Sequence, residues 1–546
     1  MKEQTKWIFV TGGVLSSLGK GIAAASIGAI MKARDLKVEM IKMDPYLNVD
    51  TSTMSPTQHG EVFVLDDGTE TDLDLGHYSR FAKVKLSKKN TITSGSVYWE
   101  VLHRERRGDY LGSTIQTIPH ITDEIKNRLE ELESKCDVVI VELGGTVGDL
   151  ESMPFLEAIR QITKSKKDRC AIVHLVWIPY VSSASETKTK PAQASVRTLM
   201  EHGIVPDILV CRSDNKLSKE AITKLALFGG VEESMVIEAP NVDSVYEVPI
   251  NLYNNGMNDA LEKTLNLHNK KPDLSSWNNY IEKLKNPNGE INIAIVGKYS
   301  DVKDSYKSLY EAIDHASTRH ITKSNITLVS AEDIEERGEE ILKEFDGIIV
   351  AGGFGNRGFE GKVSAVKFAR ENSIPFLGIC LGMQAAVVEF ARNVIGLDDA
   401  NSTEMNPDTN FPVICLMDEQ MEVTDMGGTL RVGTYDCKLE ENTNIFTAYG
   451  LNVISERHRH RWEFNPNYEE MMKEYGLIIS GKEVKTNIVE SVEIKNHRWF
   501  VAVQFHPELK SVVPDGHPLF DDFIIHSILY NGEKSISSKY SLKKSF

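Results

Sequence analysis

Short runs of apolar residues, separated by longer stretches with helical periodicity, fill the first half of the chain. The runs at residues 7–10, 38–43, 137–142, 171–177 and 207–212 have the length and composition of buried strands. An alanine-rich stretch at residues 21–34 predicts a helix soon after the first run. Strands that alternate with helices predict a parallel, doubly wound sheet, whose ligands bind at the carboxyl ends of its strands.

This alternation stops near residue 265 and starts again at residue 291. In between, two polar stretches with Pro and Gly flank one short helical segment, which predicts a linker. A second α/β series then opens with apolar runs at 291–297, 346–353 and 374–379. We therefore predict an α/β protein with two doubly wound domains. The predicted boundaries are 1–266 for the first domain, 267–290 for the linker, 291–535 for the second domain and 536–546 for a mobile tail.

The charge balance narrows the range of partners. The 546 residues include 62 Lys and Arg against 79 Asp and Glu, which gives a net charge of −17. So acidic a chain is a poor general binder of nucleic acid or anionic membranes, although phosphate ligands need only a local basic cluster. Unpatterned cysteines, a start without a signal peptide and the lack of a membrane-length apolar run predict a cytoplasmic protein.

The strongest chemical signal is the thiol of Cys380. It follows the predicted strand at 374–379 and precedes a helix that we expect to begin near Met383, with Gly378 and Gly382 two residues away on either side. This spacing is typical of a nucleophile elbow, in which a sharp turn presents one side chain and small neighbours admit the substrate. A thiol at a helix N-terminus is also favoured as the thiolate.

Partners for this thiol are offered by His506 and Glu508. Two residues apart, they would point the same way on a strand and supply a base and the group that orients it. The alternative is that Cys380 is an inert core residue, as most cysteines in strands are. We assign that role to the five cysteines without such a setting, which are Cys136, Cys170, Cys211, Cys415 and Cys437.

A second candidate site follows the first predicted strand. Residues 10–21 form a Gly-rich loop that ends in Lys20 and opens the alanine-rich helix, the placement that a phosphate-binding loop requires. The strict Walker pattern is not met, because Val14 replaces its first Gly and Gly21 replaces the Ser or Thr after the Lys. Without that hydroxyl, a metal ion would depend more on carboxylates.

Two acidic positions can serve that metal ion. Glu142 ends a predicted strand and so lies at the carboxyl edge of the sheet. Asp72 and Asp74 alternate with leucines, and we predict that both face one side of an extended segment. Hard oxygen ligands shared with phosphates suit Mg²⁺. For Asp72, a solvated acidic surface stays an open alternative, and the basic clusters at 104–107 and 188–190 are in isolation more often exposed surface.

Seven segments together resemble the CTP synthase family, from the first strand to about residue 520. They are residues 12–22, 43–50, 54–61, 70–77, 142–151, 188–191 and 456–461. The resemblance implies an amidoligase domain with a P-loop-like site for ATP and UTP, followed by a class I glutamine amidotransferase domain that makes ammonia. Such a ligase of pyrimidine biosynthesis phosphorylates O4 of UTP with ATP and replaces the phosphate with ammonia to give CTP. The resemblance also implies Mg²⁺, activation by GTP, inhibition by CTP and a homotetramer.

The resemblance also assigns roles to single residues. The catalytic triad would be Cys380, His506 and Glu508, with the N–H groups of Gly353 and Leu381 as the oxyanion hole. The Mg²⁺ ligands would be Asp74 and Glu142. The ATP contacts would be Ser17, Leu18, Gly19, Lys20, Gly21, Ile22 and Asp74, with Pro240, Asn241 and Val242 on a less specific motif. The contacts to UTP or CTP would be Ser16, Asp149, Leu150, Glu151, Lys188, Thr189, Lys190, Pro191, Ala192, Gln193 and Lys224. The glutamine contacts would be Gly353, Leu381, Gly382, Met383, Gln384, Glu404 and Arg461.

The same residues leave two alternative functions open, and the chain differs from the family pattern at one place. The first rival is another ATP-dependent glutamine amidotransferase, which amidates a carboxylate. The second is an assembly or filament protein that keeps a nucleotide-binding fold. The stretch between residues 416 and 426 is shorter than in some relatives of the family, and from its length alone we expect a different response to GTP.

Overall fold

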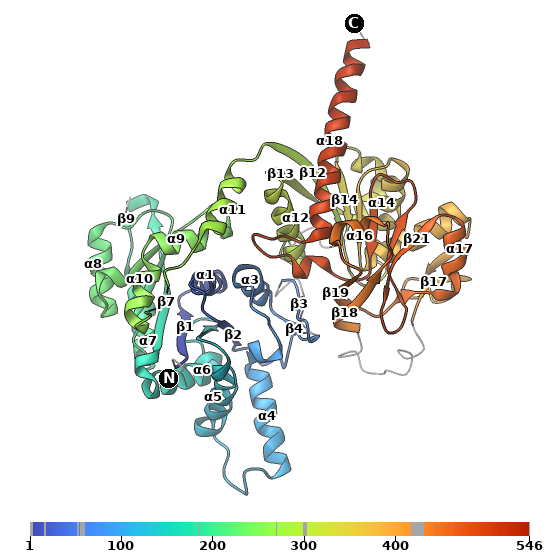
Figure 1. Cartoon of the computed structure of the whole chain (residues 1–546). Coiled ribbons are helices and arrows are strands. Elements are labelled where there is room, and N and C mark those ends of the chain that lie inside the picture. Colours follow the sequence, from blue (N-terminus) through green and yellow to red (C-terminus); the bar gives the residue numbers. More distant parts are fainter. Residues whose placement is uncertain are drawn as a thin grey trace. The chain divides into compact units, whose positions relative to one another are not determined.

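The computed structural model describes residues 4–15, 18–51, 54, 60–184, 186–268, 270–298, 303–416 and 431–544. These residues fall into two compact units. The first unit is Met1–Thr51 with Thr71–Ile281, and the second unit is Ser52–Glu70 with Glu282–Phe546. Figure 1 shows the elements of both units in chain order.

The first unit is built on a seven-stranded parallel sheet, as the hydrophobic pattern predicts. Its strand order is β11-β10-β7-β1-β6-β2-β5, and all neighbouring strands pair in parallel. The strands are β1 (Lys6–Gly12), β2 (Val38–Asp44), β5 (Thr91–Thr93), β6 (Val138–Leu143), β7 (Cys170–Ile178), β10 (Ile208–Ser213) and β11 (Val236–Pro240). Because β1 lies between β7 and β6, the loops that leave these three strands meet at one edge of the sheet.

Helices of the first unit bury the apolar faces of this sheet. Val97, Ile125 and Ile159 of α4, α5 and α6 share one core cluster with residues of β1, β2 and β6. Elsewhere α1 passes close to both β2 and α3, where a Cβ on Gly28 would meet Met40 and Ala82 at 2.9 and 3.0 Å. The helices are α1 (Lys20–Ala33), α3 (Leu73–Ala82), α4 (Ser94–Arg107), α5 (Thr122–Glu130), α6 (Met153–Ser165), α7 (Lys190–Glu201), α8 (Lys219–Gly229), α9 (Val248–Asn254), α10 (Met257–Leu265) and α11 (Ser275–Lys285).

The prediction of an extended segment through Asp72 and Asp74 is wrong. Asp72 is the N-cap of α3, where its side chain accepts a hydrogen bond from the backbone N–H of Asp74 at 3.2 Å. A carboxylate that satisfies a free N–H of the first turn stabilises a helix start, and this local bond outweighs the alternating pattern. Asp74 therefore lies in the first turn of a helix.

A nine-stranded mixed sheet forms the core of the second unit. Its order is β13-β12-β14-β15-β23-β22-β21-β18-β19; the strands from β13 to β23 pair in parallel, and those from β23 to β19 pair antiparallel. The strands are β12 (Gly289–Gly297), β13 (Thr322–Ser330), β14 (Gly347–Val350), β15 (Phe376–Ile379), β18 (Arg431–Leu439), β19 (Val453–His460), β21 (Leu477–Glu483), β22 (Val489–Ile494) and β23 (Phe500–Val503).

Two core clusters cover the two faces of this sheet. One includes Phe376 of β15 and Phe500 of β23, which stack with ring centroids 4.3 Å apart, together with residues of α14 and α15. The other joins residues of α12 and α18 to the opposite face. The helices are α12 (Lys307–Arg319), α13 (Ala331–Arg337), α14 (Phe359–Glu371), α15 (Leu381–Phe390), α16 (Asn444–Tyr449), α17 (Glu469–Glu474) and α18 (Pro518–Lys544).

Short strands complete the fold. One small sheet contains β16 (Ala400–Ser402), β17 (Phe411–Cys415) and β20 (Glu463–Phe464). Two hairpin-like pairs are β3 (Phe63–Val64) with β4 (Glu70–Thr71), and β8 (Tyr180–Val181) with β9 (Glu186–Thr187). The first of these pairs belongs almost wholly to the second unit, although it precedes α3 in sequence.

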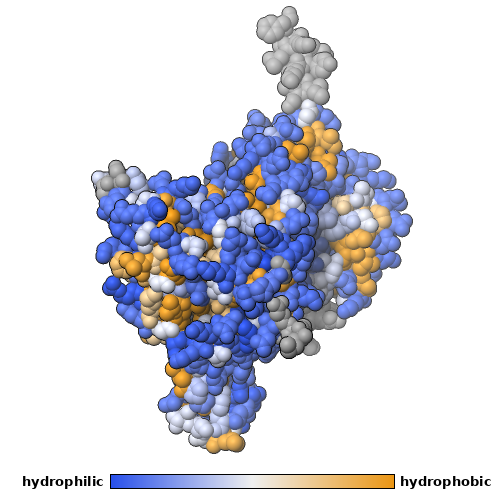
Figure 2. All heavy atoms as spheres, turned by 60° about the vertical axis from the view of Figure 1, so that its left-hand side comes forward, coloured by the Kyte–Doolittle hydropathy of each residue, from blue (hydrophilic) through white to orange (hydrophobic). Residues whose placement is uncertain are grey.

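Much of the predicted linker and most of the predicted tail have regular structure. Helix α11 occupies the short helical segment expected within the linker, and α18 continues to Lys544, through most of the predicted tail. The mobility of that tail stays a prediction. Figure 2 shows a face on which polar residues cover most of the area. Among the described residues, no helix has both the length and the apolar character that a membrane crossing requires, and all six cysteines are free thiols.

Candidate functional site

The thiol of Cys380 lies at a sharp turn between β15 and α15. Its backbone is in an unusual conformation (φ 53°, ψ −105°), and the residue is the N-cap of α15. The turn needs glycine at position 382, because a Cβ there would collide with the backbone oxygen of Val350. A strained residue at the start of a helix, held by close backbone contacts, is the geometry of a nucleophile elbow.

The prediction that His506 and Glu508 lie on a strand is wrong, although the two side chains do meet. Strand β23 ends at Val503, and His506 is the N-cap of a 3₁₀ turn at Pro507–Lys510. Pro507 ends the extended segment because its fixed φ suits the first position of a helical turn. Within this turn, His506 Nδ1 lies 2.7 Å from Glu508 Oε1.

This contact controls the charge of the imidazole. Burial by itself lowers the pKa of His506, but the negative charges of the Glu508 carboxylate and of the Cys380 sulfur outweigh it and raise the pKa to about 10. The ring therefore keeps its proton at neutral pH, with Nδ1 committed to Glu508. The other ring nitrogen, Nε2, can then exchange a proton with a substrate group bound at Cys380, which lines the same pocket.

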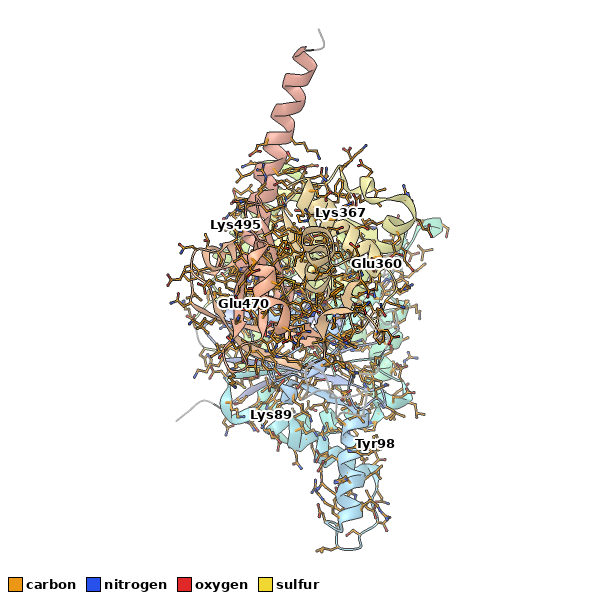
Figure 3. All side chains as sticks on the ribbon, turned by 90° about the vertical axis from the view of Figure 1, so that its right-hand side faces the viewer. Lys89, Tyr98, Glu360, Lys367, Glu470 and Lys495 are labelled. Carbon is orange, nitrogen blue, oxygen red and sulfur yellow. The ribbon has the colours of Figure 1, made fainter. Side chains whose placement is uncertain are left out.

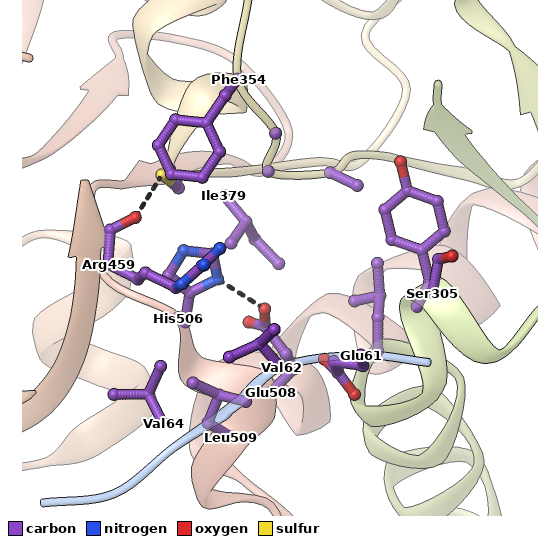
Figure 4. Close-up of a pocket in the computed structure, with 16 residues that line it drawn as sticks. Glu61, Val62, Val64, Ser305, Phe354, Ile379, Arg459, His506, Glu508 and Leu509 are labelled. Carbon is purple, nitrogen blue, oxygen red and sulfur yellow. Dashed lines mark hydrogen bonds and ion pairs between the residues drawn. The ribbon is translucent and has the colours of Figure 1, made fainter. Parts of the chain in front are cut away.

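That pocket is shown in Figure 4. Cys380, His506 and Glu508 line it together with Gly352, Gly353 and Phe354 from the loop that follows β14. The guanidinium of Arg459, on β19, lies 5.4 Å from the ring centroid of Phe354. The Cys380 thiol donates a long hydrogen bond of 3.8 Å to the backbone oxygen of Arg459. A concave site with a thiol, a charged imidazole and an adjacent glycine loop suits acyl transfer.

One wall of the pocket comes from a segment far away in sequence. Glu61, Val62 and Val64 line it and cross the foreground of Figure 4. The segment is tied to β19 by two ion pairs: Arg457 Nε to Asp66 Oδ1 at 2.7 Å and Arg459 Nε to Glu70 Oε1 at 2.6 Å. Sequence analysis missed this role of residues 60–70, because nothing local in them indicates a partner near residue 458.

The residues expected to contact glutamine gather near the same loop and helix. Leu381, Gly382, Met383 and Gln384 form the first turn of α15. Glu404 Oε1 accepts a hydrogen bond from the backbone N–H of Gly355 at 2.6 Å, and burial raises the pKa of its carboxyl while Lys298 and Arg461 oppose that rise. Gly353 lines the pocket itself, so the structure brings Gly353, Glu404 and the start of α15 to one region.

The second candidate site lies at the carboxyl edge of the sheet in the first unit. The loop after β1 leads to Lys20 at the start of α1, and Lys20 Nζ donates to the Gly145 backbone oxygen at 2.6 Å. A Cβ on Gly21 would collide with the Asp74 carboxylate, so α1 and α3 approach closely here. Leu18 and Gly19 directly precede α1 and Ile22 lies in its first turn, whereas Ser16 and Ser17 lie outside the described residues.

Lys42 joins the two expected metal ligands, and sequence analysis missed it. Its ammonium contacts the carboxylate of Asp74 and lies 2.9 Å from Glu142 Oε1 and 3.8 Å from Asp44 Oδ1. Burial lowers the pKa of Lys42, but these carboxylates outweigh it and hold the pKa well above its ordinary value. The sequence did contain a signal for this role, because Lys42 stands at the carboxyl end of a predicted strand, where ligands of a parallel sheet bind.

The donor set here suits a metal ion that shares its ligands with phosphate. Within the described ranges, no group of three or more His, Cys, Asp and Glu is arranged to hold a metal ion by itself. Mg²⁺ usually needs only one or two carboxylates, because substrate phosphates and water supply the other oxygens. Asp74 and Glu142, adjacent to Lys20 and Lys42, fit that requirement.

The remaining predicted residues lie on neighbouring loops. Pro240 at the end of β11 lines a small apolar pocket with Gly19 and Ile22, and Asn241 and Val242 follow it. Arg212, a further residue that sequence analysis missed, also lines this pocket and donates to Asn241 Oδ1 at 2.8 Å.

Most of the residues expected to hold a pyrimidine nucleotide follow β6 and β7, and Lys224 follows β10. Asp149 precedes a 3₁₀ turn at Leu150–Ser152, which contains Leu150 and Glu151. Lys188 and Thr189 precede α7, whose first turn is formed by Lys190, Pro191, Ala192 and Gln193. Lys188 pairs with Glu186 at 2.5 Å, and Lys224 on α8 pairs with Glu220 at 2.7 Å. The sheet order places the loops of β6 and β7 on either side of the loop of β1.

Comparison with known proteins gives consistent matches over nearly the whole chain. Residues 6–267 match the family model described as "CTP synthase N-terminus", and residues 301–526 match that of "Glutamine amidotransferase class-I". The chain is 53% identical to a CTP synthase of Carboxydothermus hydrogenoformans over 96% of this chain and 99% of that protein. It is 51% identical to a CTP synthase of Methanocaldococcus jannaschii over 97% and 99%.

We predict that Glu508→Gln lowers the pH at which His506 loses its proton, from about 10 toward the ordinary value. The amide has no charge to stabilise the imidazolium, while burial still opposes it. The measurement is the pH profile of Cys380 alkylation by iodoacetamide, followed on the Cys380 peptide by mass spectrometry. A profile identical to that of the unaltered protein would contradict the role of Glu508.

Proposed function

The chain belongs to the CTP synthase family and is a glutamine-dependent ligase, and we propose that it makes CTP through a 4-phosphorylated UTP intermediate. The observation that carries the proposal is the convergence of Lys20, Asp74 and Glu142 at the phosphate loop of the first unit. The second unit supplies the nitrogen from glutamine. Membership of this family argues against the two alternative functions, which are a carboxylate-amidating enzyme and a purely structural protein.

In the nitrogen-producing half, Cys380 is the nucleophile. Its thiolate attacks the side-chain carboxamide carbon of glutamine, and the negative charge that develops on oxygen is met by the N–H groups of Gly353 and Leu381. His506 gives its proton to the departing nitrogen, ammonia leaves, and a thioester forms; water then hydrolyses it. Glu508 holds the imidazole in place, and Glu404, Arg461 and the first turn of α15 (residues 381–384) bind the amino acid.

In the synthetic half, O4 of UTP attacks the γ-phosphorus of ATP, and ADP leaves. Ammonia then attacks C4, and the phosphate leaves with O4. Lys20 and residues 17–22 hold the ATP phosphates, and Pro240, Asn241 and Val242 adjoin the adenine. Asp74 and Glu142 would hold Mg²⁺, whose charge would neutralise that of the phosphates. The contacts to UTP, or to CTP as inhibitor, are Ser16, Asp149, Leu150, Glu151, Lys188, Thr189, Lys190, Pro191, Ala192, Gln193 and Lys224.

The organisation and regulation of the enzyme are further proposals. We assign residues 1–266 to the synthetic domain and 291–535 to the amidotransferase domain, with GTP as activator and a cytoplasmic location. The short stretch at 416–426, proposed to alter the GTP response, lies outside the described residues apart from Leu416. A homotetramer is supported by exposed apolar side chains on and near α4, the helix that carries Tyr98 in Figure 3. These are Trp99, Leu102, Leu111 and Ile118, each more than half exposed.

The intermediate is tested with UTP that carries ¹⁸O at position 4. Incubation with ATP, Mg²⁺, GTP and glutamine is expected to form CTP and to place the label in inorganic phosphate, because O4 leaves with the transferred phosphoryl group. Mass spectrometry of the released phosphate measures this transfer. CTP formed with the label in water would contradict the intermediate, and a failure to form CTP would contradict the substrate assignment.

We expect two variants to distinguish the role of the glutaminase site from that of the synthetic site. Cys380→Ala should abolish synthesis from glutamine and leave synthesis from free ammonia, because only the first route needs the thiol. Lys20→Ala should lose both routes, because the ATP phosphates serve either nitrogen source. Rates of CTP formation with each nitrogen source measure this. Equal losses in Cys380→Ala, or ammonia-dependent turnover retained in Lys20→Ala, would contradict the two-site account.

A further inference from the structure

Two buried lysines hold the loop that follows β14, and the mechanism above assigns neither of them a role. Lys362 of α14 is fully buried, and its ammonium contacts the backbone oxygen of Ala351 and lies 3.3 Å from that of Gly352. Lys298, directly after β12, is 5% exposed and donates to the backbone oxygens of Phe354 (2.7 Å) and Gly355. Four of the five consecutive backbone carbonyls in residues 351–355 thus accept hydrogen bonds from these two lysine side chains.

Such contacts fix the directions of the neighbouring N–H groups. In a planar trans peptide, the C=O of one residue and the N–H of the next point to opposite sides. The loop shows this in one unit: the Phe354 oxygen accepts from Lys298, while the N–H of Gly355, in the same peptide, donates to Glu404 Oε1 at 2.6 Å. Lys298 on one side and Glu404 on the other therefore hold this peptide plane.

The same relation holds two peptides earlier. The Gly352 oxygen faces Lys362, so the N–H of Gly353 points away from Lys362. Gly352 and Gly353 line the pocket with Cys380 and His506. A Cβ on Gly352 would lie 3.0 Å from His506 Cε1 and 3.6 Å from Cys380 Cβ, so the backbone passes directly beside the nucleophile and its base.

We propose that Lys362 is a positioning residue for the oxyanion hole: by holding the Gly352 carbonyl, it aims the N–H of Gly353 at the oxygen that becomes negative when Cys380 attacks. Lys298 has the matching role for the Gly355 peptide and its hydrogen bond to the glutamine-binding Glu404. The inference rests on the proposed glutaminase chemistry and on Gly353 as its donor.

The cost of burying Lys362 supports a specific role. Removal from water opposes its charge, and burial, with the nearby charge of Lys298, lowers its pKa to about 7. Its ammonium or amine donates to carbonyl oxygens in either state, so the peptide plane is held on both sides of that pKa. An apolar side chain of the same length would fill the space without this desolvation.

The test compares Lys362→Met with three other variants. Methionine is an unbranched side chain one atom shorter than lysine, and it cannot donate a hydrogen bond. Lys298→Met probes the second peptide, and Lys362→Gln retains an N–H donor. Lys367→Met makes the same change at a partly exposed position of the same helix (Figure 3). Each variant is assayed for CTP formation from glutamine and from ammonia. Each is also assayed for inhibition by the aldehyde analogue of glutamine, whose adduct with Cys380 carries an oxygen in the oxyanion position.

Lys362→Met is expected to lower kcat with glutamine by roughly 10- to 100-fold, part of the effect of losing one oxyanion donor. The aldehyde should bind more weakly by a similar factor, while KM for glutamine and the ammonia-dependent rate stay near those of the unaltered enzyme. Lys362→Gln should recover part of the loss, and Lys367→Met should show none. Lys298→Met should instead mainly raise KM, because it loosens the peptide that contacts Glu404.

Three results would overturn the inference. One is unchanged kcat and aldehyde affinity in Lys362→Met. Another is a rise in KM alone, which would indicate a packing role. The third is a parallel loss of glutamine- and ammonia-dependent synthesis in both Lys362 variants, which would indicate a general structural role. Failure of the proposed function itself is distinct, because the unaltered enzyme would then show no glutamine-dependent synthesis.

Discussion

The glutaminase site depends on the backbone turn at Cys380. A residue with a side chain pays about 1–3 kcal/mol to adopt such a conformation, so the surrounding structure must impose it. It does so through backbone contacts that only glycine allows, of Gly382 against Val350 and of Gly378 against Gly382. Strand β14 therefore fixes the position of the thiol, and its continuation at residues 351–355 carries the N–H groups proposed to face it.

Charge is organised differently in the two sites. In the second unit, a partly buried imidazolium is stabilised by Glu508, and helix α15 directs the positive end of its dipole at the thiol. In the first unit, Lys42 balances the carboxylates of Asp74, which is partly buried, and Glu142, which is buried, beside the phosphate loop. The first arrangement suits a thiolate nucleophile, whereas the second suits phosphates that share a divalent cation.

Sequence patterns predicted what depends on neighbours in the chain. The buried strands, the glycine-flanked turn at Cys380 and the loop before Lys20 all follow from local spacing, and the structure contains each of them. Two local predictions were wrong because one residue changed the backbone: Asp72 caps a helix, and Pro507 starts a 3₁₀ turn. Lys42, Lys362 and residues 60–70 were missed because their partners lie on other elements, and only the folded chain brings them together.

The central claim is that nitrogen released at Cys380 becomes the exocyclic amine of CTP. The most direct measurement supplies glutamine labelled with ¹⁵N in its side-chain amide, together with UTP, ATP, Mg²⁺ and GTP, and follows the product by mass spectrometry. The account predicts CTP with one ¹⁵N at N4. Glutamine hydrolysed without labelled CTP, under conditions in which free ammonia supports synthesis, would contradict it.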